Sequence, residues 1–201
     1  MATAAENKRA KRIKILDAAN RLFLDRSVAE TAIDDVVKLA GVAKGTFYLY
    51  FRDKTDLLDQ IVMRHTAELF MRSCAALREK LGEREMSVSD QLCFLADEIT
   101  VFLRQNRKIT AMLDKRFVAL FTDTVYRQTE EFRADIEYLT GLLTAQGLTA
   151  ERARKRLFVL TQTIGSVCCG AILDEQPYTI EEIMPSVHEL IRRMTEGGGA
   201  A

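Results

Sequence analysis

The sequence predicts an all-α protein, and three observations support this fold class. The chain has 201 residues but only two prolines, Pro177 and Pro185, so the first 176 residues contain no proline interruption. Apolar residues make up 48% and charged residues 29%, as in soluble globular proteins. No stretch alternates apolar and polar residues for long enough to indicate a sheet.

Helical periodicity and end signals place the elements in order. The first helix is expected at about residues 8–25, where Ile15, Ala19 and Phe23 recur at helical spacing. Thr31 can cap the second helix, and Gly41 is its expected stop. The expected helices after the first are 31–40, 44–50, 53–81, 87–105, 109–113, 115–145, 149–174 and 179–195.

Other features limit the class of protein. The longest uncharged run, residues 157–173, is short and polar for a membrane span, so we interpret it as a buried helix. The N-terminus is polar and basic, unlike a signal peptide, and we expect a cytoplasmic protein with no membrane contact. The cysteines have no metal-like spacing, and Cys168 and Cys169 are either oxidant sensors or small buried side chains. We expect no metal and no cofactor.

The charge is unevenly distributed, although the net charge is zero. Residues 1–16 hold five basic side chains against Glu6 alone, which gives +4 for this segment. A basic arm on a neutral to acidic body fits a local contact with a polyanion. The alternative is a solvated, frayed terminus.

The first sixty residues predict a helix-turn-helix unit on a supporting helix. In such a unit the short second helix of the pair enters the major groove of DNA. Phe47 and Phe51 lie four positions apart and are expected to pack inward. Lys44 and Thr46 then lie where side chains reach base edges, and the hydroxyls of Tyr48 and Tyr50 can reach phosphates.

These residues also carry a family resemblance. The segments "ILDAANRLF" and "TAIDDVVKLAGVAKGTFYLYFRDKTDLL" resemble the DNA-binding domain of TetR family transcriptional regulators (TetR/AcrR type), over roughly residues 11–60. The resemblance implies a helix-turn-helix domain at 8–56, with the helix-turn-helix itself at about 32–51. It also implies a helical effector-binding and dimerisation domain at 57–196, with flexible tails at 1–7 and 197–201.

The resemblance also implies DNA-binding roles by position. Lys44 is the candidate for reading guanine, beside Thr46, and Gly45 would let the backbone approach the DNA closely. Phosphate contacts would come from the remaining side chains, Thr31, Tyr48, Tyr50 and Lys54.

The chain departs from the family pattern at three points. Ser27-Val28 stand where a glycine is usual near the end of the first helix, and Val37 replaces a frequent alanine. Ala43 replaces a capping serine before the recognition helix, which costs about 1 kcal/mol of helix stability.

The C-terminal two-thirds yields an expected dimer seam and an expected pocket. A stripe of small residues in the helix at 149–174 allows close helix packing, and with the last helix it could form a four-helix seam between two copies or close the monomer core. The dimer candidates are Gly165, Ser166, Cys169, Gly170 and Leu190. The pocket candidates, for an apolar or aromatic effector, are His65, Leu69, Phe94, Phe117, Phe121 and Gln162. His65 could instead be a satisfied histidine at a domain junction, and any of the others could be plain core.

Together these features predict a ligand-responsive regulator that binds a palindromic operator on double-stranded DNA as a homodimer and is released by a small effector. An enzyme is not expected, because only His65 and His188 are present and no phosphate loop or nucleophile motif occurs. The alternative is an all-α dimeric adaptor without specific DNA binding.

Overall fold

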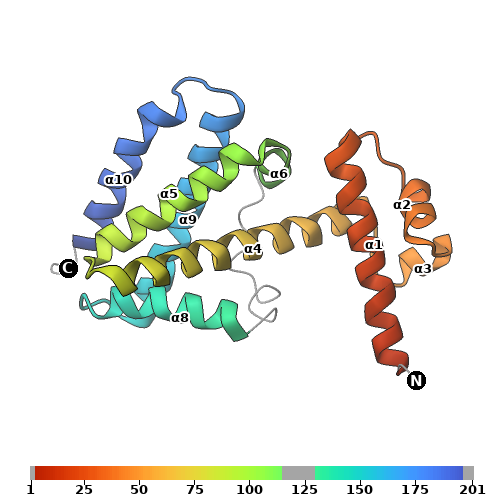
Figure 1. Cartoon of the computed structure of the whole chain (residues 1–201), viewed down its shortest axis with the longest axis horizontal. Helices are drawn as coiled ribbons and strands as arrows, with labels where there is room; N and C mark the ends of the chain where they lie inside the picture. Colours follow the sequence, from red (N-terminus) through yellow and green to blue (C-terminus); the bar gives the residue numbers. More distant parts are fainter. Residues whose placement is uncertain (1–2, 115–129, 197–201) are drawn as a thin grey trace. The chain divides into compact units, whose positions relative to one another are not determined.

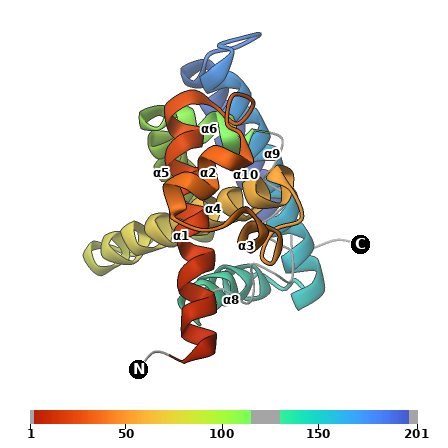
Figure 2. The ribbon, with the colours of Figure 1, turned by 90° about the vertical axis from the view of Figure 1, so that its right-hand side faces the viewer.

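The computed structural model describes residues 3–114 and 130–196, and this part of the chain is helical without strands, which confirms the all-α class (Figures 1 and 2). It divides into two compact units, Met1–Arg64 and His65–Ala201. The first unit extends past the boundary expected at residue 56, because Leu57 and Ile61 at the start of α4 are fully buried.

The N-terminal unit contains α1 (Ala4–Arg26), α2 (Ile33–Ala40), α3 (Lys44–Tyr48) and the first turns of α4 (Lys54–Glu83). Helix α1 contacts α2, and α2 contacts α3. Apolar side chains from each helix form one core, comprising Ile15, Ala19, Phe23, Val36, Val37, Phe47, Phe51, Leu57 and Ile61. Val37, one of the departures from the family pattern, is therefore accommodated in the core.

The helix ends follow the capping signals with one exception. Asp53, Ser87 and Thr149 each accept a hydrogen bond from a backbone N–H in the first turn of the helix that they precede. Ala43 makes no side-chain cap for α3, as expected. The prediction that Thr31 caps α2 is wrong, because α2 begins after Ala32 and the Thr31 hydroxyl is bonded elsewhere.

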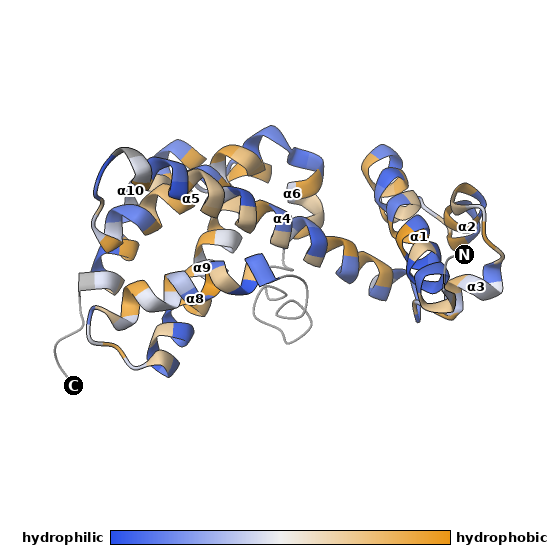
Figure 3. Cartoon of the chain, turned by 60° about the horizontal axis from the view of Figure 1, so that its bottom comes forward, coloured by the Kyte–Doolittle hydropathy of each residue, from blue (hydrophilic) through white to orange (hydrophobic). Residues whose placement is uncertain are grey.

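The C-terminal unit contains the rest of α4 with α5 (Val88–Gln105), α6 (Arg107–Leu113), α8 (Glu130–Thr144), α9 (Ala150–Leu173) and α10 (Ile180–Glu196). The helix expected at 115–145 is described only from residue 130, and 115–129 lie outside the described residues. Hydrophobic and hydrophilic stretches alternate along these helices (Figure 3), as expected for helices that bury one face.

Helix α9 lies at the centre of this unit, in contact with α5, α6, α8 and α10. By length and composition it is the one helix among the described residues that could cross a membrane, but the core helix of a soluble protein passes the same test. In its most apolar window 44% of the residues are buried. These contacts support its interpretation as a core helix that also presents an outer face.

Candidate DNA-binding surface and effector pocket

The turn between α2 and α3 gives α3 its position. Gly41 ends α2 in the left-handed conformation, with φ of 66°, which glycine adopts without steric cost. Phe47 and Phe51 fix α3 to the core of the unit, because both are almost fully buried, and their ring centroids lie 5.5 Å apart. The short helix is therefore fixed to the unit by one face and open on the other.

The open face of α3 carries most of the residues that the sequence assigned to DNA. Tyr48 is 54% exposed, Lys44 is exposed, and Thr46 and Tyr50 are half-buried. A Cβ atom placed on Gly45 would meet nothing within 4 Å, so the backbone here borders open space. This geometry suits close approach to a groove, and the base and phosphate contacts of these residues stay predictions.

Lys44 has a partner that sequence reasoning missed. Its Nζ lies 2.7 Å from Oδ1 of Asp34 on α2, and both side chains are exposed. The hydrogen bond to Asp34, together with the negative charge of that carboxylate, raises the pKa of Lys44. A pairing across the turn between α2 and α3 leaves no local pattern in the sequence.

Thr31 and Lys54 hold the loop between α1 and α2. Thr31 is 1% exposed, and its hydroxyl donates to the Ser27 carbonyl at 2.7 Å. The Lys54 ammonium donates to the carbonyls of Val28 at 2.8 Å, Ala29 at 3.4 Å and Thr31 at 3.1 Å. An ammonium has three donors, so a phosphate contact by Lys54 would have to displace one of these bonds.

The basic arm is helical in the structure. Thr3 and Glu6 form a capping box that begins α1, and Lys8, Arg9 and Lys11 lie exposed on its surface. Arg12 is bonded to Gln60, and its guanidinium lies 5.9 Å from the ring centroid of Phe51. The arm therefore adds an ordered basic surface to the same unit as α3.

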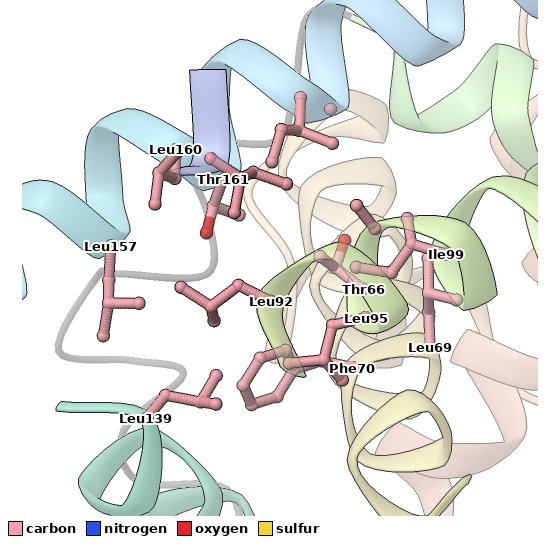
Figure 4. Close-up of a pocket in the computed structure, with 14 residues that line it drawn as sticks. Thr66, Leu69, Phe70, Leu92, Leu95, Ile99, Leu139, Leu157, Leu160 and Thr161 are labelled. Carbon is pink, nitrogen blue, oxygen red and sulfur yellow. The ribbon is translucent and has the colours of Figure 1, made fainter. Parts of the chain in front are cut away.

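An apolar cavity of about 70 Å³ lies inside the C-terminal unit, between α4, α5, α8, α9 and α10 (Figure 4). Among the described residues, Thr66 and Thr161 are the only polar side chains that line it. The remaining lining residues are Leu69, Phe70, Leu92, Leu95, Ala96, Ile99, Leu139, Leu157, Leu160, Ile164, Gly165 and Ile191. The part of the lining that the structure describes is thus almost entirely aliphatic and contains a single aromatic ring.

The structure brings only one of the expected pocket residues to this cavity, Leu69. His65 is buried with Nδ1 3.7 Å from Glu68, and Phe94 lines a separate polar groove beside His188. Gln162 does not line the cavity, and Phe117 and Phe121 lie outside the described residues. The leucines that do line it were missed because leucines at helical spacing on a buried face are equally typical of a core.

The residues expected at the dimer interface lie in different environments, some buried and some exposed. Gly165 is buried and lines the cavity, and Cys169 is fully buried with Sγ 4.0 Å from the Thr110 carbonyl oxygen. These two small residues therefore serve packing within one subunit. Ser166 is exposed, and Gly170 and Leu190 are half-buried.

The buried cysteines have depressed reactivity. All four are reduced and buried. Burial raises the pKa of Cys74 and of Cys169 to about 12, and it also raises the pKa of Cys93 and Cys168. A thiol that stays protonated is a poor nucleophile, which favours the packing interpretation of Cys168 and Cys169. Within the described residues, no group of three or more candidate ligands could hold a metal ion.

An open recognition helix on a three-helix core, followed by a helical unit with an internal apolar pocket, defines a helix-turn-helix regulator. Residues 15–61 match the family model of bacterial regulatory proteins, tetR family. The fatty acid metabolism regulator protein of Bacillus subtilis (strain 168) is 26% identical over 92% of this chain and 96% of its own length. The regulator AcrR of Shigella flexneri is 45% identical over 47 residues, which are 23% of this chain and 22% of that protein.

Solved structures show the same fold along the chain. A TetR transcriptional regulator from Rhodococcus sp. RHA1 has a TM-score of 0.64 at 20% identity, covering 96% of this chain and 100% of its own. FadR from Bacillus subtilis, in complex with stearoyl-CoA, has a TM-score of 0.51 at 19% identity, covering 94% and 99%. Residues 15–61 are thus similar to the DNA-binding domains of tetR-family regulators, and these likenesses support a ligand-responsive DNA-binding transcriptional regulator.

Proposed function

We propose that this regulator is a repressor that binds a palindromic operator as a homodimer and dissociates when an aliphatic effector enters the C-terminal pocket. The observation that carries the proposal is the aliphatic lining of the cavity, part of which comes from α4. The same helix begins in the DNA-binding unit, so a ligand that shifts α4 also acts on that unit.

The proposed DNA contacts lie on the open face of α3 and in the turn that follows it. Lys44 reads a base, Thr46 and Gly45 allow close approach, and Tyr48 and Tyr50 bind phosphates. Thr31 and Lys54, first expected at phosphates, take the role of fixing the loop before α2, since their polar atoms are bonded there. The helical basic arm adds attraction that does not depend on sequence.

The proposed dimer surface is the outer face of α9, with α10 beside it. Phe158 and Val159 are large apolar side chains on α9 that are 38% and 47% exposed, and Ser166 is exposed on the same helix. Covering apolar side chains of this size with a second copy lowers the free energy, because their surface is removed from water. A twofold dimer presents two recognition helices and so fits a palindrome.

The proposed effector is a molecule with an aliphatic chain. One relative of this chain is named a fatty acid metabolism regulator, and the FadR structure holds stearoyl-CoA. The lining supports an aliphatic over an aromatic ligand, because Phe70 is the one aromatic side chain among its described residues. A volume of about 70 Å³ is below the roughly 300–1,000 Å³ of ligand pockets, so an entering chain must spread the surrounding helices.

That expansion supplies the proposed switch. A ligand that fits only the expanded arrangement shifts the population toward it, and the helices that move include α4. The proposal places the protein in the cytoplasm, beside the chromosome, and assigns it neither enzymatic activity nor a membrane contact.

The test combines DNA binding with a variant that blocks the cavity. We expect the protein to bind the intergenic DNA upstream of its own gene, with affinity that falls steeply as salt rises, and stearoyl-CoA to release it. Ala96→Leu fills the cavity and should preserve DNA binding while abolishing release, as measured by fluorescence anisotropy. Biphenyl, an apolar aromatic compound that does not intercalate into DNA, should not release the DNA.

The results separate the alternatives. Failure of the wild-type protein to bind any upstream DNA would support the adaptor function. Normal release of the Ala96→Leu variant by stearoyl-CoA would show that this cavity is not the effector site.

A further inference from the structure

The two threonines in the pocket differ in how their hydroxyls are used. Thr66 is 1% exposed and has a polar interaction of its own. Thr161 is half-buried on α9, and Figure 4 shows its hydroxyl oxygen directed into the space bordered by Leu92 and Leu157. Thr161 is thus the polar group that the lining offers to a ligand.

The Thr161 hydroxyl makes no hydrogen bond to any residue in the described ranges 3–114 and 130–196. A threonine hydroxyl within a helix can donate to the carbonyl four residues earlier. In the same unit the Thr140 hydroxyl donates to Ile136 at 2.7 Å, and the Thr195 hydroxyl donates to Ile191 at 3.0 Å. Within the described residues neither Thr161 nor Thr163 on α9 makes such a bond, and of these two only Thr161 lines the cavity.

A lone hydroxyl on a hydrocarbon wall discriminates between ligands. Leaving it unpaired against a plain methylene chain is costly, whereas a ligand oxygen at that point restores a hydrogen bond. Sites that hydrogen-bond a ligand oxygen reject analogues that lack it far better than hydrocarbon walls reject an extra methylene. One polar atom can therefore select among chains that are otherwise alike.

We infer that the pocket takes an aliphatic chain that carries an oxygen function, a hydroxyl or a carbonyl, at the point where the chain passes Thr161. The inference rests on the proposed pocket and names the chemistry that it selects. The ligand oxygen accepts from the Thr161 hydroxyl or donates to it, and the rest of the chain contacts the leucines and isoleucines.

Positional isomers of octanol test this, because 1-, 2-, 3- and 4-octanol share one composition and differ only in where the oxygen lies. Isothermal titration calorimetry on the full-length protein should find one isomer preferred by about tenfold, the value of one hydrogen bond. Thr161→Val removes only the hydroxyl and should erase the preference. Thr163→Val, at a half-buried position on the same helix that does not line the cavity, should retain it.

A second measurement does not depend on any ligand. Because the Thr161 hydroxyl has no hydrogen bond to a described residue, Thr161→Val should leave the melting temperature unchanged or raise it, whereas Thr140→Val should lower it by breaking the bond to Ile136. If all isomers bind the wild-type protein and Thr161→Val equally, the inference is overturned while the pocket stands. If no isomer binds the wild-type protein, the proposed effector pocket itself fails.

Discussion

At the scale of one residue, a substitution of Lys54 distinguishes a structural role of this basic side chain from a contact with DNA. Its ammonium bonds three carbonyls of the α1–α2 loop. Lys54→Met should therefore destabilise the protein by about 1.5–3 kcal/mol, the range for hydrogen bonds from charged groups. Urea unfolding monitored by circular dichroism measures this directly.

The salt dependence of DNA binding distinguishes the two roles of Lys54. If Lys54 is structural, the slope of log K against log salt for the folded variant matches the wild-type slope. A phosphate contact would instead lower the slope by about one. Lys38→Met, which removes an exposed lysine from α2, is the control for the loss of one positive charge.

Asp34 is predicted to restrain DNA binding, because its carboxylate holds Lys44 at 2.7 Å and adds a negative charge beside the recognition helix. Asp34→Asn should tighten nonspecific DNA binding by about threefold at low salt, with a smaller effect at high salt where the charges are screened. Fluorescence anisotropy with a random-sequence duplex at two salt concentrations measures it.

Asp35→Asn is the matched control for Asp34→Asn. It changes the net charge by the same amount one residue away, but Asp35 pairs with Arg26 of α1 and not with Lys44. If both variants tighten binding equally, the effect is one of overall charge, and the Asp34–Lys44 pair has no special role.

At the scale of an element, the end of α1 shows why the family favours glycine there. Ser27 follows α1 with φ of 81° and ψ of 160°, a region that is essentially restricted to glycine and costs about 1–3 kcal/mol for other residues. Ser27→Gly should therefore stabilise the protein, by about 1 kcal/mol after the loss of the weak Ser27–Glu30 bonds.

Ser27→Ala provides the comparison for this prediction. It removes the same hydroxyl but keeps the backbone strain, so the alanine variant should unfold at lower denaturant than the glycine variant. Equal midpoints for the two variants would show that the backbone conformation at residue 27 carries no cost.

The helices could be predicted from the sequence because their signals are local. Asp53, Ser87 and Thr149 act within one turn of their own chain, and Gly41 needs only its own backbone angle. Thr31 failed as a cap because a carbonyl in the preceding turn, that of Ser27, competed for its hydroxyl. Propensity alone does not decide which of two acceptors a hydroxyl will bond.

Some features of the candidate sites could likewise be predicted from local signals in the sequence, and others could not. The inward packing of Phe47 and Phe51 follows from their spacing of four, and the structure confirms it. The pocket could not be predicted, because its walls come from five helices and consist mainly of aliphatic side chains, which are equally typical of a core. Pairings such as Lys44 with Asp34 depend on the turn geometry, which the sequence does not encode in a local pattern.

At the scale of the whole molecule, α4 and α9 each contribute to more than one part of the protein. Helix α4 begins in the N-terminal unit and contributes Leu69 and Phe70 to the pocket of the other unit. Helix α9 contributes Leu157 and Leu160 to the same pocket and exposes Phe158 and Val159 on its outer face. The proposed ligand site and the proposed dimer surface therefore lie on different faces of one helix.

The dimer surface provides the last prediction. Val159→Glu places a carboxylate on the outer face of α9, and burying an unpaired charge against a second copy is strongly unfavourable. We expect the variant to sediment as a monomer at micromolar concentration and to lose operator binding, while its helix content stays unchanged. Val101→Glu is a close control, because Val101 is 49% exposed against 47% for Val159 but lies on α5. If the Val159→Glu variant is still a dimer, the interface lies elsewhere. If the wild-type protein is a monomer and still binds a palindrome, DNA binding does not require a dimer.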